Sequence, residues 1–217
     1  SIRYLKMSQA ASRTQEFLDW DEQAVENKLV DLASIIASHE LMGFGSFVPN
    51  KNYLRLAKGY LPETVDHPYW LCFNGALLGV LKAFGDNSLK IDFVMDRQGE
   101  GYERRARIQH AQWDDILASP YREMVGTLSF ADEQEMLPLQ AAEMLAWHIR
   151  DHADSRSIGK PTNRPAAKIL WEKKTITKPW SPEDIDNFVT KYQADHPLSP
   201  VNRPDLHRRF ERGNMKK

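Results

Sequence analysis

The feature that most constrains the fold is the segment PYWLCFNGALLGVLKAF at residues 68–84, which is apolar on nearly every side of a predicted helix. A helix without a polar face has to be covered by other elements, and a sheet is the simplest cover. After a GDN turn, residues 89–95 have the length and the unbroken apolarity of a strand that is covered on both faces. We therefore expect this helix and this central strand to form the core.

Before this pair, the sequence predicts one long helix and one short strand. Apolar residues recur every three or four positions within residues 19–40, which is typical of a helix with one buried stripe. Asp19 and Glu22 resemble a capping box at its start. Two glycines end the helix, and residues 45–50 are predicted to form a short strand that is followed by a polar loop through residue 62.

After this pair, the chain continues the alternation of helices and strands. Residues 100–118 are charged and only loosely periodic, which favours a surface helix or helix pair, and residues 123–130 favour a second strand. Pro138 is predicted to open a helix with one apolar side, made of Leu139, Ala142, Leu145, Ala146 and Ile149. The alternation predicts an α/β fold in which helices pack on a sheet.

After residue 154 the composition of the sequence changes to a stretch rich in Ser, Arg, Gly, Lys and Pro, which is typical of a linker. We expect residues 1–154 to form one α/β domain and residues 155–217 to form a linker, two short helices and a basic tail. Ser181 has the position of a helix N-cap, with Asp184 at the third helical position.

Composition excludes several classes of protein. The formal net charge of the 217 residues is −1, so a nucleic acid or an anionic membrane would have to be bound through a local patch. No apolar run reaches the length of about 20 residues that a membrane-spanning helix needs, and we expect no membrane partner. The single cysteine, Cys72, cannot form an intramolecular disulfide and is expected to be a buried thiol in a cytoplasmic protein.

Three acidic residues fall at comparable places in the predicted elements. Asp96 ends one strand, Asp132 directly follows the next, and Glu143 lies early in the helix after that. Carboxylates that converge repel one another unless a cation neutralises them, and Mg²⁺ and Mn²⁺ prefer such oxygen ligands. The alternative is that these acids only cap loops and helix ends, which is common for acids at such positions.

Other familiar chemistries receive little support from the sequence. His148 and His152 are separated by four residues and could share a zinc ion, but a pair that faces solvent is the more ordinary interpretation. The sequence contains no G-x-S-x-G, P-loop lysine, G-x-G-x-x-G or C-x-x-C motif. Serine hydrolases, P-loop NTPases, classical dinucleotide-binding enzymes and zinc ribbons are therefore disfavoured.

Three ordered segments, IDFVMDRQ, GTLSFADEQ and LPLQAAEMLAW, together resemble the bacterial domain of unknown function 3800 family, which is RNase H-like. The resemblance extends from about Phe17 to about Tyr192. Family members usually begin with a strand bearing Asp-Glu-Ser-Gly, which has no counterpart before Phe17. The aspartate of the family's helix is replaced here by Glu143, a longer carboxylate.

This resemblance implies an RNase H-like mixed sheet with flanking helices and a C-terminal helical extension. It also implies a metal-dependent nuclease in which Asp96, Asp132 and Glu143 hold Mg²⁺ or Mn²⁺. Arg97, Arg104, Arg105 and the basic tail would then contact the backbone of a nucleic acid. The alternative is a catalytically inactive binding or regulatory protein on the same fold, whose partner is another protein or a second copy.

Overall fold

The computed structural model describes residues 2–62, 65–84, 90–97, 110, 113–114, 119–160, 163–172 and 175–195. Both helices and strands are present, as the sequence predicts, so the chain is an α/β protein. The elements in chain order are α1 (Met7–Ser12), η1 (Gln15–Phe17), α2 (Glu22–Ser38), β1 (Gly43–Phe47), α3 (Asn50–Leu56), α4 (Pro68–Phe84), β2 (Ile91–Asp96), η2 (Arg122–Met124), β3 (Val125–Ala131), α6 (Leu137–Ser157), α7 (Pro165–Glu172), β4 (Thr175–Pro179) and α8 (Pro182–Asp195).

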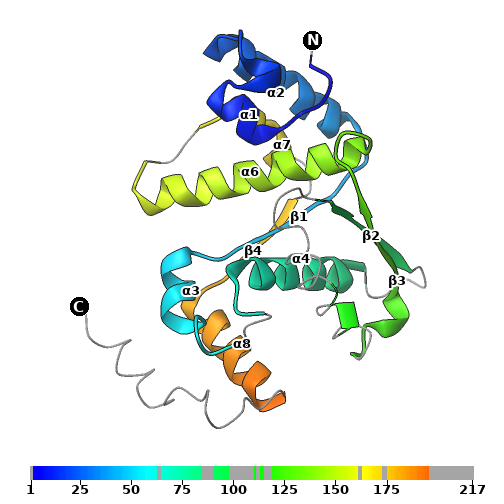
Figure 1. The fold of residues 1–217 in the computed structure, drawn as a ribbon, viewed down its shortest axis with the longest axis vertical. Coiled ribbons are helices and arrows are strands. Elements are labelled where there is room, and N and C mark those ends of the chain that lie inside the picture. The colour runs from blue at the N-terminus through cyan, green and yellow to red at the C-terminus, as the bar shows by residue number, and fades with distance from the viewer. Residues whose placement is uncertain are drawn as a thin grey trace.

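The described strands form two parallel pairs, β1 with β4 and β2 with β3. In Figure 1, β1 and β4 lie between α6 and α4, while α1 and α2 lie beyond α6. Glycine allows this close packing, because a Cβ atom at Gly43 would lie 2.9 Å from Leu145 Cδ2, and one at Gly45 would clash with Ile149. The glycines that were predicted to end a helix therefore belong to β1 and let α6 approach it.

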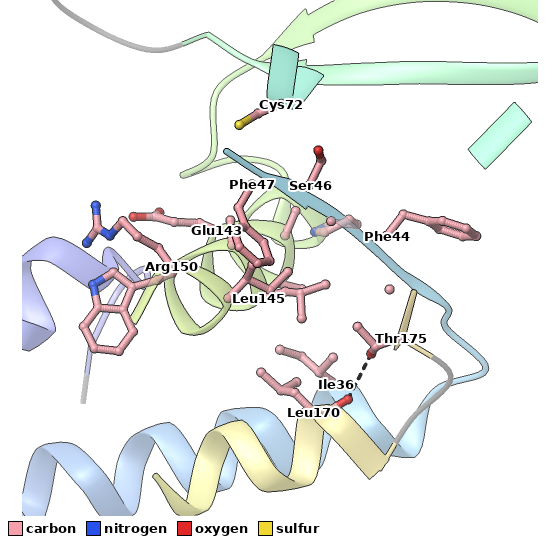
Figure 2. A pocket seen from close by; sticks show the side chains of 18 of the residues that line it. Ile36, Phe44, Ser46, Phe47, Cys72, Glu143, Leu145, Arg150, Leu170 and Thr175 are labelled. Atoms are coloured by element: carbon pink, nitrogen blue, oxygen red, sulfur yellow. Dashed lines mark hydrogen bonds between the residues drawn. The ribbon is translucent and has the colours of Figure 1, made fainter. Parts of the chain in front are cut away.

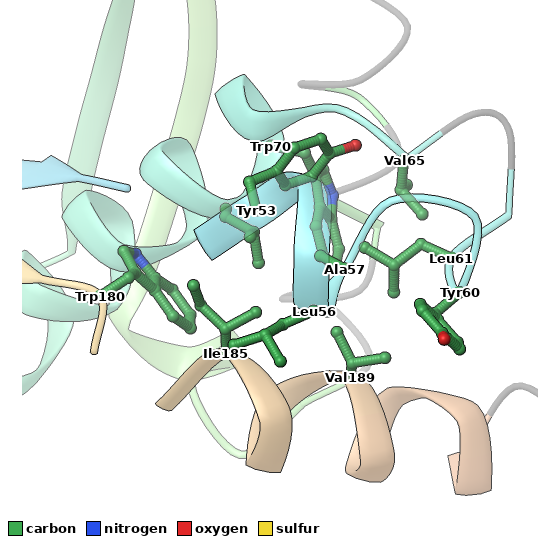
Figure 3. Packing of buried hydrophobic residues seen from close by; sticks show 11 residues of the cluster. Tyr53, Leu56, Ala57, Tyr60, Leu61, Val65, Trp70, Trp180, Ile185 and Val189 are labelled. Atoms are coloured by element: carbon green, nitrogen blue, oxygen red, sulfur yellow. The ribbon is translucent and has the colours of Figure 1, made fainter. Parts of the chain in front are cut away.

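Among the described residues, buried apolar side chains form three clusters. One joins α3, α4 and α8 around Trp70 (Figure 3), and another joins α4 to β2 and β3. The remaining cluster lies between the N-terminal residues, α2, α6 and α7. Because α4 contributes to two of the clusters, its apolar residues are buried on more than one side, as the sequence of residues 68–84 predicts.

The strand predicted within residues 89–95 is present as β2, but the expectation that both its faces are covered is wrong. Phe93 is buried against α4, whereas Val94 is 39% exposed and Asp92 is exposed. The reason is the small sheet, since α4 covers one face of the β2–β3 pair and leaves the alternate side chains in contact with solvent.

Two local predictions in the first quarter of the chain are also wrong. The N-cap of α2 is Asp21, whose carboxylate accepts a hydrogen bond from the Ala24 N–H at 2.7 Å, so Asp19 is not the cap. The expected loop after residue 50 contains α3, which is held by burial of Tyr53 and Leu56 against α8.

The C-terminal part confirms both short helices, as α7 and α8. Ser181 Oγ accepts a hydrogen bond from the Asp184 N–H, and Asp184 accepts one from the Ser181 N–H, so the predicted cap is confirmed. Strand β4 was not predicted, and the boundary expected at residue 154 falls inside α6. The basic tail, and all of residues 100–118 except 110 and 113–114, lie outside the described residues. Among the described helices, none is long and apolar enough to cross a membrane.

Candidate functional site

The ends of β2 and β3 place two of the predicted site residues at one sheet edge. The strands are parallel, and Asp96 is in register with Ala131, the residue before Asp132. The pairing continues past the strand, because the Arg97 N–H donates a hydrogen bond to the Ala131 carbonyl at 2.8 Å. Parallel neighbours that end together bring the residues after both strands to the same edge, as the sequence argument expected.

Asp132 organises the turn that follows β3. Its Oδ1 atom accepts a hydrogen bond from the Gln134 N–H at 2.8 Å, and its carbonyl accepts from the N–H groups of Glu135 and Met136. The residue is exposed. A carboxylate that stabilises a turn makes such bonds. They agree with the alternative raised in the sequence analysis, in which the acids cap loops and helix ends.

Lys6 lies at the centre of the acidic cluster. Its Nζ atom is 2.5 Å from Glu133 Oε1 and 3.8 Å from Glu143 Oε2. Burial alone would lower the pKa of Lys6, but the hydrogen bond to Glu133 and the charges of Glu143, Glu133 and Asp96 outweigh burial and raise the pKa overall. The carboxylates of Glu133 in the β3–α6 turn and of Glu143 in α6 therefore pair with one ammonium group, and the charge of Asp96 in β2 also acts on it.

The backbone on either side of Lys6 is fixed to α6. The Leu5 N–H donates to Gln140 Oε1 at 2.8 Å, and the Met7 N–H donates to Glu143 Oε1 at 3.2 Å. Gln140 in turn donates from Nε2 to the Glu133 carbonyl at 2.7 Å. Gln140 thus links the N-terminal residues to the β3–α6 turn, and these bonds hold Lys6 beside the carboxylates.

Glu143 has an unusual environment for a carboxylate. Burial raises its pKa to about 7, the charge of Lys6 opposes this shift, and a hydrogen bond with Glu133 adds to it. Its Oε2 atom is buried and accepts no hydrogen bond from the residues that the structure describes. Near neutral pH this group therefore occurs in both protonation states, and additional positive charge nearby would favour the ionised one.

The structure thus pairs Glu143 with Lys6, on which the charge of Asp96 also acts, and it adds Glu133. Sequence reasoning missed Lys6, Glu133 and the linking Gln140, although the LQAAE segment had marked the helix that carries Gln140. Within the described ranges, no group of three or more His, Cys, Asp or Glu side chains is arranged to hold a metal ion. Arg97 is exposed and donates from its guanidinium to the Phe130 carbonyl, while Arg104 and Arg105 lie outside the described residues.

The histidine pair of α6 does not face solvent as a pair, so that interpretation is wrong. His148 is 1% exposed and packs edge-on against Trp147. Neither of its ring nitrogens has a hydrogen-bond partner in the described part of the chain. Burial and the charge of Arg164 lower the pKa of His148 from 6.5 to about 4, although the charge of Asp151 acts in the opposite direction.

The low pKa of His148 predicts an acid-sensitive fold. The unfolded chain binds a proton near pH 6.5 and the folded chain only near pH 4, so stability falls as the pH drops through this window. Protonation of this residue is expected to cost up to roughly 3 kcal/mol of unfolding free energy below pH 4. Urea denaturation between pH 7 and pH 4 should show that His148→Leu loses less stability than the wild type.

The matched control for this comparison is His152→Leu on the same helix. His152 is half-buried and packs against Trp171, so its replacement should leave the acid dependence close to that of the wild type. Equal slopes of stability against pH for wild type and His148→Leu would contradict the assignment of this sensitivity to His148.

A groove of about 1380 Å³ lies beside β1. It is bordered by α4, by α6 and by the C-terminal end of α2. Figure 2 shows side chains of β1 and α6 around it, including Phe47, Leu145 and Glu143. Cys72 of α4 also lines it, and burial raises the pKa of this thiol to about 11, against a hydrogen bond from the Val48 N–H. The thiol is therefore protonated at neutral pH and is not poised for nucleophilic attack.

Comparison with known proteins gives no match: no family model, curated protein or solved structure is significantly similar to this chain.

Proposed function

We propose that this protein is a Mg²⁺- or Mn²⁺-dependent nuclease built on an RNase H-like α/β domain. The observation that carries the proposal is the pairing of Lys6 with Glu133 and Glu143, together with the charge of Asp96, which also acts on this ammonium group. These acids come from three separate parts of the chain, and their mutual repulsion is offset by a cation or by protonation of Glu143. The ammonium group of Lys6 is positively charged, as a divalent metal ion at the same place would be.

The side chains are of the chemical type that a hard divalent cation binds, although no three of the described acids are arranged around a common metal position. Carboxylate oxygens are the ligands that Mg²⁺ and Mn²⁺ prefer, and the buried Oε2 atom of Glu143 has no hydrogen bond from the described residues. When bound, such an ion activates water and stabilises the leaving oxygen in the cleavage of a phosphodiester. Asp96 and Glu143 would hold it, Asp132 shapes the turn beside it, and the exposed Arg97 would attract the phosphate backbone.

The RNase H-like part of the proposal depends on the resemblance to the domain of unknown function 3800 family. The order of its segments supports it: a strand that ends in Asp96, a parallel strand followed by Asp132, and the helix that carries Glu143. Among the described strands β1 pairs only with β4, and it is beside β1 that the family's Asp-Glu-Ser-Gly strand would pair if one were present. That strand would bring a further carboxylate to the site.

The direct test is hydrolysis of fluorescently labelled single- and double-stranded DNA and RNA by the purified protein. We expect cleavage with about 5 mM Mn²⁺ or Mg²⁺ and none with EDTA. A millimolar concentration is chosen because sites that bind divalent ions weakly need this level to be occupied. Cleavage should weaken as salt rises, since phosphate contacts depend on the release of counterions. Cleavage that persists in EDTA would contradict the metal requirement.

The alternative is an inactive binding or regulatory protein on the same fold. Two observations favour it: Lys6 already neutralises the carboxylates, and Asp132 has a structural role in its turn. In that case the chain would bind no Mn²⁺ and cleave none of the four substrates under any of these conditions.

A further inference from the structure

The groove beside β1 follows the length of α6. A Cβ atom at Gly43 would lie against Leu145, and one at Gly45 against Ile149, so β1 and α6 run side by side in the same direction. The α6 residues that line the groove fall within residues 137–150, a helix length of about 20 Å at 1.5 Å per residue. The groove is therefore long enough for an extended ligand.

The two ends of the groove differ in chemistry. Where α2 ends and α6 begins (Figure 1), it is lined by Ile35, Leu41 and Leu137, which are 56%, 53% and 70% exposed. Arg150 lines the other end of the α6 wall (Figure 2), and its guanidinium makes no ion pair or hydrogen bond with the residues that the structure describes. Exposed apolar side chains in a concave site favour an apolar ligand, and an unpaired guanidinium favours an anion.

The α6 wall between these ends leaves room for a ligand. Ala142 and Ala146 line the groove, are exposed, and lie eight and four residues before Arg150, so all three share one side of the helix. Glu143 also lines the groove, but its carboxylate pairs with Lys6 and does not neutralise Arg150. The wall thus offers small side chains that lead to one guanidinium.

We propose that the groove binds a fatty acid, with the apolar chain along β1 and the carboxylate on Arg150. The hydrocarbon core of a bilayer is roughly 30 Å thick and holds two acyl chains end to end, so one chain is about 15 Å long. This length fits the groove. The charge of Arg150 favours an anion over an apolar peptide strand, the other occupant that the edge of β1 would accept. The inference does not depend on the proposed nuclease activity.

The test is the binding of dodecanoate to the full chain, measured by isothermal titration calorimetry. We expect the wild type to bind it with a micromolar Kd. Arg150→Gln should weaken binding by about tenfold or more, because a charge-assisted hydrogen bond is lost. Ala142→Trp should abolish binding by filling the groove, while circular dichroism shows the variant folded.

Arg156→Gln is the matched control, since Arg156 is exposed on the same helix, lies outside the groove, and loses the same charge. Its affinity for dodecanoate should equal that of the wild type. Equal affinities of Arg150→Gln and the wild type would overturn the assignment of the carboxylate to Arg150, and with it the proposal. A wild type that binds no dodecanoate, but binds a soluble peptide of alternating Val and Thr, would overturn the proposal in favour of a paired strand.

Discussion

Replacing Asp96 by Asn is expected to reduce Mn²⁺-dependent cleavage of nucleic acid by about 100-fold or more. Even partners outside the ligand shell of a catalytic metal typically change activity by 10–100-fold, and we assign Asp96 to the shell itself. Asn keeps the shape of the side chain but carries no negative charge, so it offers a weaker ligand and leaves Lys6 with less opposing charge. The measurement is the initial rate of cleavage at saturating Mn²⁺.

Asp92→Asn provides the control for this experiment. Asp92 lies on the same strand, is exposed, and accepts hydrogen bonds from the N–H and the hydroxyl of Thr127. Its replacement removes the same charge at a position away from the acidic cluster, so the rate should stay within about threefold of the wild type, as for ordinary surface changes. Similar rates for Asp96→Asn and Asp92→Asn would remove Asp96 from the mechanism.

Replacing Trp70 by Ala is expected to lower the free energy of unfolding by about 3–5 kcal/mol, the usual cost of truncating a large buried aromatic residue. Trp70 is 1% exposed and belongs to the cluster that joins α3, α4 and α8 (Figure 3). Its ring meets those of Phe188 and Tyr192 edge-on, with centroids 5.1 Å and 5.2 Å apart. Urea denaturation followed by circular dichroism measures the change.

Leu54→Ala is the control for the truncation. Leu54 lies on α3 beside the same cluster, but it is 58% exposed, so its truncation should change the free energy of unfolding by no more than about 0.5 kcal/mol. A loss for Trp70→Ala as small as that for Leu54→Ala would mean that α8 does not pack on α4 in solution. The comparison therefore tests whether the C-terminal helix is part of the folded unit.

Helices and strands with a strong local pattern were predictable from the sequence. The helix at residues 68–84 is apolar all round, and the Ser181 cap has its partner three residues away, so both depend on neighbours in the chain. The elements that were missed depend on distant partners. Residues 50–56 become helical because Tyr53 packs against α8, and residues 175–179 become a strand because β1 lies beside them.

The candidate site shows the same division. Asp96 and Glu143 were found because each follows or occupies an element whose position in an α/β fold is predictable. Lys6 was missed because nothing in its own neighbourhood marks it, and its partner Glu133 is 127 residues away. The apolar pattern of α6 correctly pointed to Ile149, which is buried, but it also pointed to Ala142 and Ala146, which are exposed. The burial of His148 was missed because Gln140, Met144 and His148 are buried in their place.

The pairing of β1 with β4 joins segments that are far apart in the order of synthesis. Ser46 of β1 donates a hydrogen bond to the carbonyl of Lys178, 132 residues later. During translation at about 5–20 residues per second, β1 waits several seconds or more for its partner to leave the ribosome. Its sequence, GFGSF, carries no charge that would discourage pairing with other strands, so during that interval the nascent chain depends on its helices to shield this edge.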